Sequence, residues 1–211
     1  MTLNPFSIDV MATQLQADPG QFEAEFKRDC SLRLEAPFTA ALLAMMMTRA
    51  ANARFIDDDV DDIGKREIEA PQRVGGTISL LLARAPFLRW VEQATGRSPL
   101  TAVAGRLVQT RAGSPHALNW HDDIEDAKRM LGVVINLSDN PFTGGQFEMR
   151  RAGSNQPFLS HRYDRTGSMM IFAVRRGLEH RVAEVESGGP RRVYAGWFLS
   201  EPEHAGGQVA R

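Results

Sequence analysis

The sequence has few of the features that mark secreted or membrane-bound proteins. Its 211 residues include one cysteine, Cys30, so a disulfide framework is excluded and a reducing compartment is expected. No apolar run reaches membrane-spanning length, and the N-terminal segment lacks the basic stretch followed by an apolar one that a signal peptide requires. We therefore expect a cytoplasmic protein without a membrane partner.

Lysine is scarce, and neither sign of charge predominates. Only Lys27, Lys65 and Lys128 are lysine among the 25 basic residues, and the formal net charge is -1. This balance argues against a broad nucleic-acid footprint, and an arginine-rich solvated surface is the usual interpretation. The alternative is a local basic cluster, which would consist of Arg150, Arg151, Arg162, Arg165, Arg175 and Arg176.

Composition and pattern indicate one globular domain over residues 1–211. Hydrophobic residues make up 43% of the chain, which is enough for a substantial core, and no internal repeat is visible. Residues 1–100 are predicted to form a helical support region with short strands. Residues 101–200 contain successive short strands separated by turns, which is typical of an antiparallel barrel or sandwich.

The most informative motif is His121-Asp122-Asp123, with His180 farther along the chain. Two imidazoles and one carboxylate can form a facial triad, the ligand set of non-haem Fe(II) oxygenases. His121 and Asp123 are two residues apart, so in an extended strand both side chains would point to one face. A His-x-Asp pair also occurs by chance, so its context has to decide.

A predicted strand that follows His180 begins with two arginines, Arg191 and Arg192. A guanidinium on the inner face of a barrel can bind a carboxylate through two hydrogen bonds. Arg191 shares its face of the strand with Val193 and Trp197, whereas Arg192 lies on the opposite face. The pattern therefore favours Arg191 as the carboxylate-binding residue.

In this combination of motifs, residues 101–199 resemble the prolyl 4-hydroxylase-like branch of the Fe(II)/2-oxoglutarate dioxygenases. The motifs that carry the resemblance are His121-x-Asp123, Asn136-Leu137-Ser138, Gly144-Gly145-Gln146-Phe147, the run Gly167 to Phe172, His180-Arg181-Val182 and Arg191. The resemblance implies a mainly β protein with flanking helices. Its core would be a double-stranded β-helix, or jelly roll, with the N-terminal helices packed on one sheet.

The resemblance also implies roles for individual residues. His121, Asp123 and His180 would be the catalytic residues that hold Fe(II), and Arg191 would bind the distal carboxylate of 2-oxoglutarate. Arg111 and Asn136 depart from the family pattern, because relatives often have tyrosine at these two positions. We expect Arg111 and Asn136 to bind 2-oxoglutarate or to face the substrate.

The activity implied by the resemblance is hydroxylation of an unactivated carbon. The reaction would require Fe(II), 2-oxoglutarate and O2 and would release succinate and CO2. Ascorbate is a candidate reductant. The substrate would be an amino acid, or a residue of a peptide or protein. Alternatives are oxidation of a small-molecule natural product, nucleobase demethylation, or a barrel that binds metal without turnover. Asp123 favours hydroxylation over halogenation, because related halogenases bind chloride in place of this carboxylate.

Several other polar groups receive no catalytic role. The acidic run Asp57–Asp62 is interpreted as a solvated loop, because it lacks the ligand spacing of a calcium loop. His116 and His161 are interpreted as surface residues, with His116 close enough to the ligand strand to contact a substrate. His204 lies in a polar tail.

Overall fold

A curled antiparallel sheet organises residues 5–60 and 63–202, which a computed structural model of the chain describes. Its strand order is β11 (Leu159–His161), β10 (Phe147–Arg151), β13 (Leu178–Val182), β7 (Leu118–His121), β5 (Gly64–Glu69), β6 (Ala102–Thr110), β15 (Arg191–Leu199), β8 (Arg129–Asn136), β12 (Met169–Ala173) and β3 (Ser31–Leu34), with β4 (Phe55–Val60) paired to β5. Two small sheets pair β1 (Phe6–Ile8) with β2 (Thr13–Leu15), and β9 (Phe142–Gly144) with β14 (Val185–Gly188).

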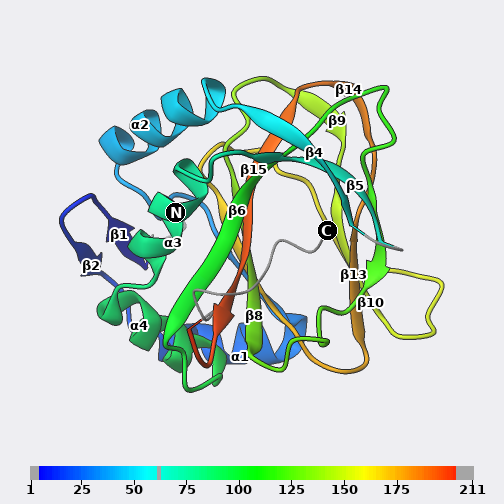
Figure 1. Cartoon of the computed structure of the whole chain (residues 1–211). Helices are drawn as coiled ribbons and strands as arrows, with labels where there is room; N and C mark the ends of the chain where they lie inside the picture. The colour runs from blue at the N-terminus through cyan, green and yellow to red at the C-terminus, as the bar shows by residue number, and fades with distance from the viewer. Residues whose placement is uncertain (1–4, 61–62, 203–211) are drawn as a thin grey trace.

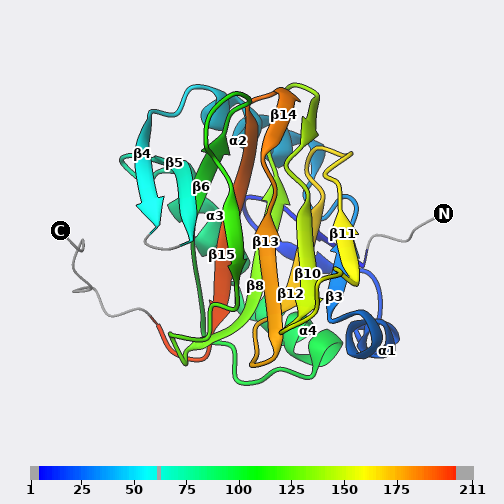
Figure 2. The same cartoon turned by 90° about the vertical axis from the view of Figure 1, so that its right-hand side faces the viewer.

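The sheet rolls up so that β13 and β10 face β6, β15 and β8 across the interior of the molecule (Figures 1 and 2). Residues from both walls line one cavity between them. β8 and β12 are buried along almost their whole length, because one face of each lines this interior and the other is covered from outside. This architecture confirms the predicted jelly-roll core.

Four helices gather on the side of the sheet that contains β6 and β15 (Figure 1). They are α1 (Gly20–Asp29), α2 (Ala40–Ala51), α3 (Val74–Leu82) and α4 (Ala85–Thr95). Thr39 caps α2, because its side chain accepts the N–H of Leu42, and Gly96 ends α4 in a left-handed conformation. The buried carboxylate of Glu69, the last residue of β5, accepts the first backbone N–H groups of α3 and so ties that helix to the sheet.

The acidic run Asp57–Asp62 is not a loop in its first part, which lies in β4. Asp58 forms an ion pair with Arg66, and Asp59 forms one with Lys65, across the β4–β5 hairpin. These cross-strand cations allow consecutive carboxylates to occupy a strand. The last two residues of the run lie outside the described residues.

The interpretation of two histidines as surface residues is also wrong. His116 and His161 have exposed fractions of 8% and 5%. His116 Nδ1 accepts the N–H of Arg111, and the His161 ring packs edge-on against Tyr163. His204 lies outside the described residues. Within residues 5–60 and 63–202, no helix combines the length and hydrophobicity of a membrane span.

Candidate active site

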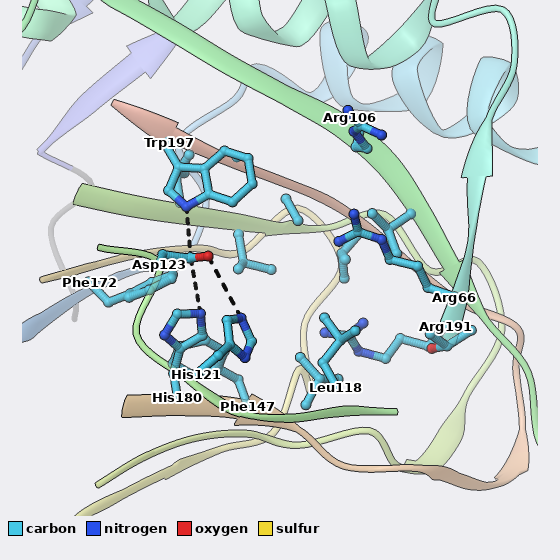
Figure 3. A pocket seen from close by; sticks show the side chains of 18 of the residues that line it. Arg66, Arg106, Leu118, His121, Asp123, Phe147, Phe172, His180, Arg191 and Trp197 are labelled. Atoms are coloured by element: carbon cyan, nitrogen blue, oxygen red, sulfur yellow. Dashed lines mark hydrogen bonds and ion pairs between the residues drawn. The ribbon is translucent and has the colours of Figure 1, made fainter. Parts of the chain in front are cut away.

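The three predicted metal ligands meet where β7 and β13 pair. His121 is the last residue of β7, and it lies directly opposite His180 in the register of the two strands, with ring centroids 4.2 Å apart. Asp123 lies beyond the end of β7. The expectation that the side chains of His121 and Asp123 project from one extended strand is therefore wrong. Instead, a φ of 60° at Asp123 turns the chain, and its carboxylate faces both histidines (Figure 3).

The donor atoms of this cluster suit a single metal ion. His180 Nε2 lies 3.3 Å from Asp123 Oδ2, and His121 Nε2 lies 3.9 Å from Asp123 Oδ1. One donor atom from each of the three residues falls within 4.8 Å of the others. Metal–ligand bonds of about 2.0–2.2 Å at right angles place neighbouring donors about 3 Å apart. With a shift of the side chains, His121, Asp123 and His180 would therefore be able to hold one metal ion.

The protonation states of these groups also suit a metal. His121 Nδ1 lies 2.7 Å from the carbonyl oxygen of Asn119, which assigns the proton to Nδ1 and leaves the Nε2 lone pair facing Asp123. Burial and the charge of His180 lower the pKa of His121. Burial raises the pKa of Asp123, but the hydrogen bond and charge of His180 outweigh it and hold that pKa well below its usual range. Deprotonated donors are what a metal ion requires.

Two residues behind Asp123 bond to its carboxylate. Trp197 Nε1 donates to Oδ2 at 2.8 Å, and Arg129 Nη1 donates to Oδ1 at 3.3 Å. The strand alternation placed Trp197 on the inner face, but neither residue was predicted to contact Asp123. The sequence offers no local signal for Arg129, because the contact depends on how β7 and β8 are brought together.

Arg191 lies in the same cavity as the triad and is almost completely buried, with 2% of its surface exposed. Its Nε has no hydrogen-bond partner among the described residues, and its guanidinium lies 4.9 Å from the ring centroid of Tyr163. Burial lowers the pKa of Arg191 and raises the pKa of Tyr163 to about 12. Arg192, by contrast, is paired with Asp139 at 2.8 Å and Gln109 at 2.7 Å.

The other two predicted co-substrate residues lie apart from this group. Arg111 is half-exposed and forms an ion pair with Glu67 at 3.0 Å. The Asn136 amide is buried, and it donates to the carbonyl oxygens of Tyr163 and Arg165 at 3.1 Å each. Neither residue lines the cavity that contains the triad. In this arrangement, Asn136 fixes the loop that carries Tyr163 behind Arg191.

One cavity, open to solvent at its mouth, contains the triad and Arg191. Its walls are largely apolar and include Val108, Val133 and Phe172. The polar lining that the sequence did not reveal consists of Arg66, Arg106 and Thr110. Thr110 lies opposite Arg191 in the β6–β15 register, and its hydroxyl has no partner among the described residues.

Residues 107–199 match the family model described as the 2OG-Fe(II) oxygenase superfamily. The matched segment runs from within β6 to the end of β15, so it contains the His-Asp-His cluster and Arg191. Residues 107–199 are thus similar to the 2OG-Fe(II) oxygenase superfamily. The protein is an enzyme, an oxidoreductase that uses Fe(II) and 2-oxoglutarate. No curated protein sequence gives a significant match.

Similar solved structures support the fold. An oxidoreductase of the 2OG-Fe(II) oxygenase family from Burkholderia pseudomallei has 18% identity and a TM-score of 0.66, over 88% of this chain and 92% of that one. A prolyl-4-hydroxylase from Pseudomonas putida has 16% identity and a TM-score of 0.64, over 87% and 99%. The α-ketoglutarate-dependent epimerase SnoN from nogalamycin biosynthesis has 15% identity and a TM-score of 0.62, over 86% and 82%.

Proposed function

We propose that this protein is a 2-oxoglutarate-dependent hydroxylase in which His121, Asp123 and His180 hold Fe(II) and Arg191 binds the distal carboxylate of 2-oxoglutarate. The observation that carries the proposal is the buried guanidinium of Arg191, which shares a cavity with the triad and has an unpartnered Nε. Buried charges are normally paired, so an unpaired one in a cavity calls for an anionic ligand.

Thr110 adds to this argument. Its unpartnered hydroxyl lies directly across from Arg191 on the neighbouring strand, so one carboxylate can accept from both residues. Tyr163 packs against the guanidinium from behind and limits its movement. A dicarboxylate anchored at this end extends its other end along the cavity toward the triad.

Each part of the chain has a chemical task in this proposal. Bound Fe(II) supplies O2 activation coupled to decarboxylation of 2-oxoglutarate to succinate and CO2. The three ligand residues fix the orientation of the metal site, and the apolar walls around Val133 and Phe172 exclude water from it. Because Arg66 of β5, in the N-terminal half, lines the same cavity, we further propose that residues 1–211 act as a single oxygenase domain.

The favoured substrate is an amino acid, or a residue of a peptide or protein, and the likeness to a prolyl-4-hydroxylase supports this class. The likeness to an epimerase of natural-product biosynthesis supports a small-molecule alternative. Fold likeness does not select between them, because one iron centre serves many pockets. If candidate peptides stimulate succinate release and methylated oligonucleotides do not, the result would support an amino-acid, peptide or protein substrate.

The direct test is anaerobic addition of Fe(II) and 2-oxoglutarate to the purified protein. Chelation of the metal by the keto acid should give a weak visible charge-transfer band. Asp123→Ala should lose the band and the turnover while its circular dichroism stays that of the folded protein. A wild-type protein that binds Fe(II) but gives no band with 2-oxoglutarate would contradict the proposed function.

A further inference from the structure

Two arginines line the cavity in addition to Arg191, and neither has a task in the proposed chemistry. Arg66 lies on β5 and Arg106 on β6, and both line the cavity that contains the triad and Arg191 (Figure 3). We infer that Arg66 and Arg106 form a carboxylate-binding subsite for the substrate. The inference rests on the proposed function, since it assumes that Arg191 is occupied by 2-oxoglutarate.

The orientation of Arg66 is fixed from behind. Its Nε donates to Asp58 Oδ2 at 2.7 Å, and both side chains are largely buried, with exposed fractions of 16% and 23%. Because Asp58 is bound through Nε, the two terminal nitrogens of the guanidinium remain available to the cavity.

Arg106 is the less compensated of the two cations. Within the described part of the chain, no carboxylate forms an ion pair with it, and its side chain is only partly exposed. It lies opposite Ala195 in the β6–β15 register, four positions along β6 from Thr110. At about 3.3 Å a residue, this places its backbone about 13 Å from the end of the cavity where Thr110 and Arg191 lie. Arg106 and Arg191 therefore lie at separate positions along the cavity wall.

Charge balance favours an anionic substrate. Fe(II), the Asp123 carboxylate, the Arg191 guanidinium and doubly charged 2-oxoglutarate together sum to zero. The positive charges of Arg66 and Arg106 then remain, and Asp58 neutralises that of Arg66. A carboxylate on the substrate would neutralise the remaining charge in a cavity with largely apolar walls, where a charge-assisted hydrogen bond is stronger than in water.

The position of Arg106 also suits substrate entry. Arg106 and Trp197 line both the main cavity and a neighbouring hollow next to α3, whose other lining residues include Gln72, Gly76 and Ser79. A side chain added at Gly76 would meet no atom within 4 Å, so this hollow has room for the part of a substrate that lies outside the reacting group. The subsite thus accepts the terminal carboxylate of a small molecule or an acidic side chain of a longer chain.

The test compares carboxylates with their amides in the anaerobic protein loaded with Fe(II) and 2-oxoglutarate. The probes are N-acetyl-L-proline, N-acetyl-L-leucine and N-acetyl-L-phenylalanine, each with its carboxamide, and binding is measured by calorimetry. Charge-assisted hydrogen bonds predict roughly ten- to hundredfold tighter binding of the acids. A second arm uses terminally blocked peptides with an internal glutamate or glutamine, which separates a side-chain carboxylate from a terminal one.

The variants Arg66→Met and Arg106→Met should each reduce the preference for acids about tenfold, and Arg66→Lys should restore part of it because the charge returns without the planar fork. Lys65→Met is the matched control, because it removes one cation from the adjacent, exposed position of β5 and should leave the preference intact. Equal binding of acids and amides, or no binding of any acid in the millimolar range, would overturn the inference.

The same samples show whether the carboxylate subsite or the proposed hydroxylase function is wrong. The charge-transfer band should titrate with the same 2-oxoglutarate affinity in wild type, Arg66→Met and Arg106→Met. If these variants weaken 2-oxoglutarate and leave the acid preference unchanged, the two arginines serve the co-substrate and the inference is wrong while the hydroxylase proposal stands. If wild type binds no 2-oxoglutarate, the hydroxylase proposal itself fails.

Discussion

Trp197 donates its indole N–H to Asp123 Oδ2 at 2.8 Å. The same indole ring supports the guanidinium of Arg129, whose carbon lies 3.9 Å from the ring centroid and whose Nη1 reaches Asp123 Oδ1. The carboxylate is therefore oriented from two directions by side chains of β15 and β8. A carboxylate held in this way loses little conformational entropy when it binds a metal ion.

Trp197→Phe should weaken Fe(II) binding by about ten- to a hundredfold, the usual effect of removing a hydrogen bond to a metal ligand. An aromatic ring stays at this position and Arg191 is untouched, so the affinity for 2-oxoglutarate at saturating Fe(II) should change little. Fe(II) titration under anaerobic conditions measures the first quantity, and the charge-transfer band measures the second. Trp120→Phe is the control, because that indole packs between Arg150 and Arg181 and does not line the cavity. An unchanged Fe(II) affinity in Trp197→Phe would show that the hydrogen bond does not orient Asp123.

Arg191→Ala should raise the KM for 2-oxoglutarate by about tenfold to a hundredfold, because it removes a charge-assisted contact to the distal carboxylate. The rate at saturating 2-oxoglutarate should fall less than the affinity does. Arg192→Ala should leave the KM nearly unchanged, since Arg192 is already paired with Asp139 and Gln109. Steady-state succinate release as a function of 2-oxoglutarate distinguishes the two variants, and the opposite ranking would reverse the assignment.

Gly145→Ala tests the packing around Arg191. Gly145 has a φ of 64°, and a Cβ at this position would lie 2.8 Å from Arg191 Cδ. The substitution should displace the guanidinium and raise the KM for 2-oxoglutarate, in addition to a backbone cost of about 1 kcal/mol. Gly153→Ala is the matched control, because its φ is 78° and a Cβ there meets no atom within 4 Å. Gly153→Ala should therefore lower the free energy of unfolding and leave the KM unchanged.

Much of the fold could be predicted because local pattern and chemistry agree in the strands of the second half. The runs that form β6, β8 and β12 were recognisable, and the jelly roll and its iron and 2-oxoglutarate chemistry are confirmed. The roles of individual site residues stay predictions. His121, Asp123 and Arg191 could be proposed because the motifs that contain them occur together in one order along the chain.

The remaining features depend on which strands are brought together, which a single sequence does not specify. Arg66 reaches the cavity because β5 pairs with β6 and β7, and nothing near Arg66 in sequence indicates that pairing. The strand β4 was mistaken for a loop because its carboxylates were considered without their cross-strand partners. Tyr163 lies behind Arg191 because a loop folds back, and loops carry no periodic signal.

His161 predicts a pH dependence of stability. Burial and, to a lesser degree, the charge of Arg33 lower its pKa from 6.5 to about 4, and its Nδ1 is buried without a partner among the described residues. Above pH 6.5 the imidazole is neutral in both the folded and the unfolded chain, so it has no effect. Between pH 6.5 and about 4 only the unfolded chain takes up the proton, so the folded state loses stability as the pH falls. Below about pH 4 the loss is constant, at about 3 kcal/mol.

His161→Gln should therefore gain stability relative to wild type as the pH is lowered through this window, even if it costs stability at neutral pH. Urea unfolding of the metal-free protein at several pH values measures the difference in the free energy of unfolding between the two proteins. Removing the metal with a chelator is necessary, because metal binding to His121 and His180 also depends on pH. A difference that stays constant from pH 6.5 to 4 would mean that folding does not depress the pKa of His161.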